Sequence, residues 1–210
     1  MQLHLLRHGQ TPASRENRFS GASDPPLTDT GRLMAESFGR AYAATPWAAI
    51  YTSPMTRARD TAAPLCRALG IEPVIDDALR EISHGEWEGL TNAEAEARDP
   101  AAYAYWKADV AGRGAPGGEA AFAVAARAVA AVDRIKTRHP DGNVLVVSHK
   151  ATIRIITCAL LGLDVRLYRD RIAQPTGSLT VFQLRASGPL LRRLADVAHL
   201  PPEIRDTEGT

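Results

Sequence analysis

The 210-residue chain has few cysteines and no long apolar run. Its two cysteines, Cys66 and Cys158, stand far apart on helix-like patterns and lack the paired spacing of a metal site. We therefore expect buried thiols in a reducing cytoplasm. No stretch reaches the roughly 18 apolar residues that predict a membrane-spanning helix. Arg7 and His8 interrupt the apolar N-terminal stretch, so no signal peptide is expected.

An excess of charge of either sign is also missing. The chain has 25 basic and 24 acidic residues, which give a net charge of +1. We therefore expect no large basic surface for nucleic acid or membranes. No low-complexity linker, internal repeat or break in composition divides the sequence, and residues 1–210 are interpreted as a single domain.

What the chain does contain is a set of short apolar segments that end in polar residues. Continuous apolar runs flanked by helices are typical of parallel strands covered on both faces. Ligands bind beyond the carboxyl ends of such strands. The segments and their polar ends are residues 3–6 with Arg7 and His8, residues 48–52 with Arg57, and residues 143–148 with His149.

A helix start strengthens the prediction of an anion site at these strand ends. Ser53 and Pro54 are suited to the N-cap and first position of a helix, which places Arg57 in its first turn. Helix N-termini attract anions through free N–H groups and the macrodipole. Two histidines and two arginines at strand ends, beside one helix start, predict a pocket for a compact anion.

The other segments predict an α/β protein. Residues 11–21 are expected to be a loop, which either folds over the pocket and supplies hydrogen-bond donors or is a solvated connection. Asp99-Pro100 breaks a weakly helical segment over residues 91–110. Further helices are expected over 29–43, 53–69, 119–139 and 151–161, a strand over 73–75, and an antiparallel hairpin at a sheet edge over 177–184 and 190–197.

Three glutamates crowd the irregular segment 79–90. A carboxyl group beside a bound dianion has its protonated form favoured, so one of Glu81, Glu86 and Glu88 is a natural general acid. The composition of the segment does not distinguish them. The other two are expected to be solvated carboxylates or a cap for a helix that begins near Thr91.

Together these motifs resemble the histidine phosphatase superfamily, in the branch of the phosphoglycerate mutases and related phosphatases. They occur in the family order from residue 3 to about residue 185. The resemblance implies a three-layer α/β/α sandwich with a mostly parallel sheet, and residues 91–118 as a cap over the site. The matching motifs are Arg7-His8-Gly9, Ser53-Pro54 with Arg57-Ala58 and Thr61-Ala62, Glu81 with Gly85-Glu86-Trp87-Glu88-Gly89, and Ser148-His149.

The resemblance also implies a role for each of five residues. His8 is the nucleophile, Arg7, Arg57 and His149 clamp the phosphate, and Glu81 is the proton donor. To attack, His8 needs one unprotonated nitrogen while the other donates to a backbone carbonyl. The arginines stay charged and a protonated His149 adds a third positive contact. These three cations take the usual place of a metal, so neither a metal nor another cofactor is expected.

Departures from the family pattern affect the predicted substrate contacts. Ser14 stands where many members have a phosphate-contacting asparagine, and Lys150 replaces the common glycine after the second histidine. Lys150 either reaches a second anionic group of the substrate or points to solvent from the first turn of a helix. The predicted substrate-binding residues are Arg7, Ser14, Ser20, Gly21, Arg57, His149 and Lys150.

We predict a cytoplasmic, metal-independent phosphomonoester hydrolase that acts on a small metabolite through phosphohistidine, as a monomer or homodimer without nucleic-acid or membrane partners. Family mutases carry extra basic residues in an insertion, whereas residues 91–110 contain only Arg98 and Lys107. Residues 116–119 also resemble the phosphatase branches. The alternatives are a phosphoglycerate mutase and a non-catalytic phospholigand-binding module. The latter predicts loss of a residue such as His8 or Glu81, and all are present.

Overall fold

A mostly parallel sheet forms the centre of the computed structural model, which describes residues 1–205. Within these residues, six strands lie in the order β3-β2-β4-β1-β5-β6. The first four are parallel, and β5 and β6 form the antiparallel hairpin predicted at a sheet edge. The strands are β1 (Gln2–Arg7), β2 (Trp47–Thr52), β3 (Val74–Ile75), β4 (Asn143–Ser148), β5 (Leu179–Arg185) and β6 (Gly188–Asp196).

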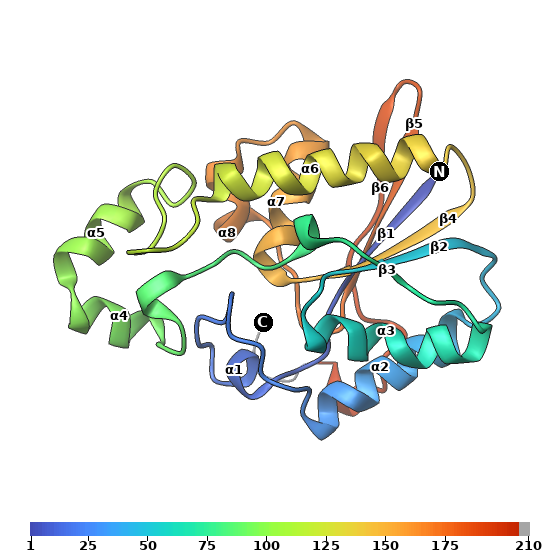
Figure 1. Ribbon diagram of the computed structural model, residues 1–210, viewed down its shortest axis with the longest axis horizontal. Coiled ribbons are helices and arrows are strands. Elements are labelled where there is room, and N and C mark those ends of the chain that lie inside the picture. Colours follow the sequence, from blue (N-terminus) through green and yellow to red (C-terminus); the bar gives the residue numbers. More distant parts are fainter. Residues whose placement is uncertain (206–210) are drawn as a thin grey trace.

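Helices cover both faces of the sheet, which gives the expected three layers (Figure 1). On β4, Val144 and Val146 pack with α6 and α7, whereas Leu145 and Val147 pack on the opposite face with α2 and α3. This alternation is the two-residue period of a strand, so a continuous apolar run supplies both halves of the core. The covering helices are α2 (Asp29–Tyr42), α3 (Thr56–Leu69), α6 (Ala121–Arg138) and α7 (Lys150–Leu161).

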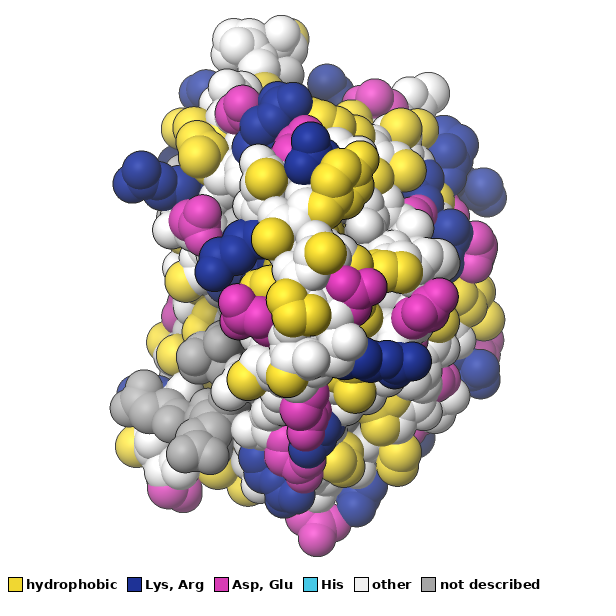
Figure 2. All heavy atoms as spheres, turned by 90° about the vertical axis from the view of Figure 1, so that its left-hand side faces the viewer, with side chains coloured by type: hydrophobic (Ala, Val, Ile, Leu, Met, Phe, Trp, Pro, Cys, Tyr) yellow, Lys and Arg dark blue, Asp and Glu magenta, His cyan; other side chains and the backbone are white. Residues whose placement is uncertain are grey.

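The cap segment, residues 91–118, projects from one end of the sandwich (Figure 1, left). It contains α4 (Asn92–Arg98) and α5 (Pro100–Ala108), separated by Asp99 as predicted. Phe19 packs into a separate apolar cluster with Trp87, Tyr103 and Trp106. The loop of residues 16–28, called the N-terminal loop below, therefore packs on the cap segment. On the outer face of this end, basic, acidic and apolar side chains are interspersed (Figure 2).

Short helices and turns complete the described part of the chain. They are α1 (Pro12–Arg15), α8 (Tyr168–Arg171) and the 3₁₀ turns η1 (Asp77–Leu79), η2 (Gly85–Trp87), η3 (Val165–Leu167) and η4 (Pro202–Ile204). The purely irregular loop expected over residues 11–21 is wrong at its start. There, Thr11 and Ser14 form a reciprocal capping box that supports one helical turn.

The predicted N-cap at Ser53 is also wrong. Helix α3 begins at Thr56, and its first N–H groups bond the carboxylate of Asp24, at 2.7 Å from Thr56 N and 3.4 Å from Arg57 N. Arg57 does lie in the first turn, as predicted. Because a carboxylate from another loop occupies this helix N-terminus, it is not the open anion site that the sequence suggested.

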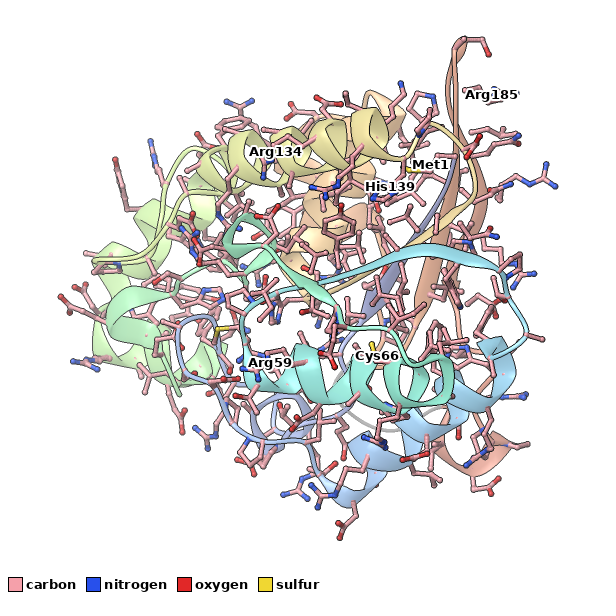
Figure 3. The ribbon with its side chains drawn as sticks, turned by 45° about the vertical axis from the view of Figure 1, so that its right-hand side comes forward. Met1, Arg59, Cys66, Arg134, His139 and Arg185 are labelled. Atoms are coloured by element: carbon pink, nitrogen blue, oxygen red, sulfur yellow. The ribbon has the colours of Figure 1, made fainter. Side chains whose placement is uncertain are left out.

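Both cysteines are buried free thiols within residues 1–205, as predicted. Cys66 lies on α3 (labelled in Figure 3) and Cys158 lies on α7. None of the helices in this part of the chain combines the length and apolar character needed to cross a bilayer.

Candidate functional site

The strand ends bring the predicted residues together at one edge of the sheet. In the parallel pairing of β1 with β4, Arg7 lies opposite Ser148, so His8 and His149 follow side by side. Their ring centroids are 5.2 Å apart. A cavity of about 170 Å³ opens beside His8. Its lining residues are Arg7, His8, Thr11, Ser14, Asn17, Arg18, Phe19, Ser20, Arg57, Glu81, His84, Asn92, Lys150, Ala151, Arg154, Tyr168 and Arg169.

His8 has the tautomer that the sequence prediction requires. Its Nδ1 lies 2.8 Å from the carbonyl oxygen of Gly9, which can only accept, so Nδ1 carries the proton. The lone pair is then on Nε2. The pKa of His8 is lowered well below its usual value, first by burial and then by the charges of Arg57 and Arg7. The imidazole is therefore neutral at physiological pH.

The hydrogen bonds of His149 indicate a neutral ring, whereas the sequence prediction has a protonated one. Arg57 Nε donates to His149 Nδ1 at 3.3 Å, and His149 Nε2 lies 2.7 Å from Ser53 Oγ. Because Arg57 cannot accept, Nδ1 is unprotonated and Nε2 carries the hydrogen. Burial, followed by the charge of Arg57, lowers the His149 pKa well below its usual value. In this structure His149 is thus neutral and buried and does not line the cavity, and its predicted protonated contact with a bound phosphate stays a prediction.

Arg57 lines the cavity but is already committed to the N-terminal loop. Nη1 donates to the carbonyl of Ser23 at 2.6 Å and to Asp24 Oδ1 at 3.2 Å. Nη2 donates to the carbonyls of Ser20 and Gly21, both at 3.2 Å. With the bond from Nε, all five N–H groups have a protein partner. To grip a phosphate through two parallel bonds, Arg57 would exchange a loop carbonyl for a phosphate oxygen.

Arg7 is buried at the end of β1 and donates from Nη1 to the carbonyl of Gln174 at 2.6 Å. Burial is the largest cause that lowers its pKa, to about 9, and the nearby Glu81 opposes the shift. The guanidinium remains charged at neutral pH. It therefore supplies fixed positive charge directly beside the His8 ring.

Glu81 lines the cavity at the N-terminus of α7. Its Oε2 accepts from the N–H of Ala151 at 3.1 Å, and its Oε1 accepts from the N–H groups of Ile82 and Thr152 at 3.0 and 3.1 Å. The helix start therefore fixes the orientation of this carboxyl group. Of the three glutamates, Glu81 is the one in the cavity lining, and its role as proton donor stays a prediction.

The other two glutamates of this segment do not line the cavity. Glu86 is exposed. Glu88 accepts hydrogen bonds from the N–H groups of Gly21, Ala22, Ser23 and His84 at 3.0 to 3.2 Å. Burial alone would raise the Glu88 pKa, but these donors and the Ser23 hydroxyl outweigh burial and lower it. Glu88 is thus an anchor for the N-terminal loop.

Of the three loop residues predicted to bind substrate, two line the cavity. Ser14 and Ser20 both line the cavity. The Ser14 hydroxyl bonds the Thr11 backbone at 2.8 and 3.0 Å within the capping box. The structure does not place Gly21 in the lining of the cavity, and its N–H is bound to Glu88, so a substrate contact of this residue stays a prediction. A Cβ at this position would lie 1.9 Å from the carbonyl oxygen of Ile82, so close packing explains the glycine.

Lys150 faces the cavity rather than solvent. Burial is the largest cause that lowers its pKa, to about 7, followed by the charges of Arg7 and Arg154. Arg154 lies four residues further along α7 and also lines the cavity. The helical spacing from Lys150 was a signal that could have identified Arg154, since residues i and i+4 share one face.

Several cavity residues had no such signal in the sequence. Asn17, which ends the first loop turn with a φ of 53°, lies close to the position where the family asparagine was expected at Ser14. Asn92 comes from the cap segment and His84 from the segment before it, and Tyr168 and Arg169 belong to α8. Tertiary packing brings these residues together. Within residues 1–205, no group of three or more His, Cys, Asp or Glu side chains is placed to hold a metal ion.

The family to which the chain belongs follows from comparison with known protein families. The model of the histidine phosphatase superfamily, branch 1, matches residues 3–197. The chain belongs to this superfamily.

Individual proteins are similar to this chain in sequence and in structure. Glucosyl-3-phosphoglycerate phosphatase of Mycolicibacterium vanbaalenii is 37% identical over 172 residues, which cover 78% of this chain and 76% of the relative. The solved structure of Bacillus stearothermophilus YhfR has a TM-score of 0.87 and 32% identity, and the match covers 95% of this chain and 99% of that one.

Longer proteins also contain this histidine phosphatase region. Bifunctional protein Rv2228c of Mycobacterium tuberculosis is 38% identical over 200 residues, or 93% of this chain. The match covers 53% of that relative. The chain therefore spans about half the length of the curated relatives that resemble it over nearly its whole extent.

The anchoring role of Glu88 leads to a testable prediction. Glu88→Gln replaces an acceptor oxygen with an NH₂ group that faces N–H donors of residues 21–23. We expect amide hydrogen exchange in this loop to become about 10-fold faster or more, since loss of a buried charge-assisted bond costs about 1–3 kcal/mol. Glu86→Gln, which alters an exposed glutamate in the same segment, is the matched control. Equal protection of the loop in both variants would contradict the anchoring role.

Proposed function

We propose that this protein is a metal-independent phosphatase that hydrolyses small phosphomonoesters through a phosphohistidine at His8. The observation that carries the proposal is the neutral His8 imidazole, with its lone pair on Nε2, in a cavity lined by arginine and lysine side chains. A neutral nucleophile avoids the repulsion that an anionic one meets at a phosphate dianion. The 37% identical glucosyl-3-phosphoglycerate phosphatase supports the same reaction class.

In the first step, Nε2 of His8 attacks phosphorus and the bond from phosphorus to the ester oxygen breaks. The leaving oxygen takes a proton from Glu81, which must hold that proton when the substrate is bound. In the second step, water attacks the phosphohistidine and loses a proton to Glu81. Inorganic phosphate leaves, and both residues return to their starting forms.

Positive charge in the site stabilises the transferring oxygens. Arg7 and Arg57 are charged groups fixed beside His8, and stabilisation of oxygen charge is the main task in phosphoryl transfer. We infer that an arriving dianion favours protonation of His149 and allows Arg57 to exchange a carbonyl of Ser20 or Gly21 for a phosphate oxygen. These arginines supply the charge that a metal would otherwise supply.

The mutase remains the second candidate on the basis of chemistry. A mutase must protect its phosphohistidine from water, with basic residues that hold the second half of the substrate. Within the cap segment, Arg98 donates to the carbonyl of Glu86 and does not line the cavity. Lys107 lies 5.7 Å from the ring centroid of Tyr103 and is likewise outside the lining. Neither cation of the cap segment is therefore placed as the basic insertion of the family mutases would be.

Phosphate release from a panel of phosphomonoesters, measured in EDTA, tests the proposal. We expect turnover by the wild-type protein and none by His8→Ala, because the nucleophile is lost. The panel includes 3-phosphoglycerate with and without its 2,3-bisphosphate, with isomer interconversion followed in the same samples. Interconversion without net release would assign a mutase. Substantial release by a folded His8→Ala protein would refute the nucleophile, and an absence of both activities would favour a binding module.

The role of Glu81 is tested by the leaving group. Glu81→Gln should slow hydrolysis of alkyl phosphates by about 10²–10⁴-fold, the usual contribution of a general acid. The loss on 4-nitrophenyl phosphate should be much smaller, because nitrophenolate leaves without a proton. Glu86→Gln is the matched control and should behave as wild type on both substrates. Equal losses on both substrates for Glu81→Gln would contradict proton donation to the leaving group.

A further inference from the structure

A second group of cations lines the cavity on the side formed by α7 and α8. Lys150 and Arg154 stand one turn apart on α7, and Arg169 belongs to α8. Burial is the largest cause that lowers the pKa of Lys150, and the charges of Arg7, Arg154 and Arg169 add to it. The phosphate-transfer chemistry at His8 uses none of these three side chains.

Lys150 and Arg154 have no directly paired carboxylate in the described part of the chain, although the charge of Glu81 acts on both of them and that of Asp170 acts on Arg154. Neither side chain forms a hydrogen bond or an ion pair within residues 1–205, and Arg154 Nε is buried without a hydrogen-bond partner. Arg127, which is also largely buried, shows the usual situation. It pairs with Glu119 at 2.8 Å and donates to the carbonyls of Ala78, Arg80 and Glu81. Buried polar atoms are normally paired in this way, so the unpartnered Nε of Arg154, in a guanidinium that lines the cavity, points to a site for an anion.

The cap segment orients the third cation. The Arg169 guanidinium carbon lies 4.4 Å from the ring centroid of Trp106 on α5, and its Nη2 lies 3.5 Å from Asn92 Oδ1 on α4. Stacking on a tryptophan holds the planar group in place while its edge stays available for hydrogen bonds. Both helices of the cap segment thus contribute to the position of a charge in the cavity.

A phosphate held at His8 by Arg7 and Arg57 leaves three further cations in the lining of the cavity. Lys150 and Arg154 come from α7, and Arg169 comes from α8. Arg18 also lines the cavity, but it is already paired with Glu16 at 2.9 Å and Glu94 at 2.8 Å. The three cations on α7 and α8 therefore remain for another anionic group.

We propose that Lys150, Arg154 and Arg169 bind a second anionic group on the substrate, a carboxylate or a second phosphate. The preferred substrates are then small phosphomonoesters that carry this group on the same molecule, rather than neutral sugar or alkyl phosphates. The proposal rests on the proposed function, which places the scissile phosphate at His8. It gives Lys150 the first of its two predicted roles and adds the two arginines.

Matched substrate pairs test the second subsite. O-Phosphoserine differs from O-phosphoethanolamine by one carboxylate, and propane-1,3-diol bisphosphate differs from propyl phosphate by one phosphate. We expect a kcat/KM at least 10-fold higher for the doubly anionic member of at least one pair, and the better pair distinguishes carboxylate from phosphate. Ratios near one in both pairs for an active enzyme would overturn the proposal.

Variants assign any preference to these side chains. Arg154→Met and Arg169→Met should each reduce the kcat/KM ratio of the preferred pair by about 10-fold, and Arg154→Lys should restore part of it because charge is retained. Arg134→Met is the control, since Arg134 is an exposed residue of α6 (labelled in Figure 3). Thermal melts verify that the variants are folded. A wild-type ratio in folded Arg154→Met and Arg169→Met would overturn the assignment.

Binding separates this proposal from the proposed function. Calorimetry with His8→Ala, which cannot form phosphohistidine, measures affinity for the same pairs without turnover. Tighter binding of the doubly anionic member, reduced by the added Arg154→Met change, supports the subsite even if no phosphomonoester is hydrolysed. Equal affinities within both pairs would overturn the subsite, whatever the outcome of the activity assays.

Discussion

The burial of positive charge beside two imidazoles is the constraint on which the site depends. Arg7 and Arg57 are almost fully enclosed at the strand ends, and His8 and His149 lie against them. Protonating either ring would add charge to a cluster that is already cationic and desolvated. Both rings are therefore neutral, and the carbonyl of Gly9 determines which nitrogen of His8 keeps its lone pair. The same charges that attract a phosphate thus keep the nucleophile ready to attack it.

The cost of burying these arginines is offset by the N-terminal loop and its supports. Arg57 donates hydrogen bonds to four residues of this loop, which are Ser20, Gly21, Ser23 and Asp24. Asp24 also accepts from the first N–H group of α3, and Glu88 accepts from the N–H groups of Ala22 and Ser23. Phe19 then packs the loop into the cluster of the cap segment. Charge in the site, loop conformation and cap position are therefore linked, and a change in any of them is expected to affect the others.

Much of the framework was predictable because it depends on local sequence. The apolar runs predicted the strands, and the polar residues that follow them predicted where the site lies on the sheet. Asp99-Pro100 predicted the break between the two helices of the cap segment. The position of Arg57 in a first turn was also local. The sequence could not show contacts whose partner is distant in the chain. Asp24, rather than Ser53, bonds the first N–H group of α3, Glu88 accepts from the N–H of Gly21, and Arg57 donates to His149. Arg169 needed the packing of α8 on the cap segment.

The protonation state of His8 tests the central claim most directly. Nitrogen NMR of the histidine rings, with His8→Asn for assignment, distinguishes a neutral ring and its tautomer from a charged one. The account predicts that at pH 6.5 in low-phosphate buffer His8 is neutral with hydrogen on Nδ1, and that it becomes charged only well below this pH, because burial and the arginines lower its pKa. A His8 ring that titrates at or above pH 6.5 would contradict the claim that buried positive charge keeps the nucleophile unprotonated.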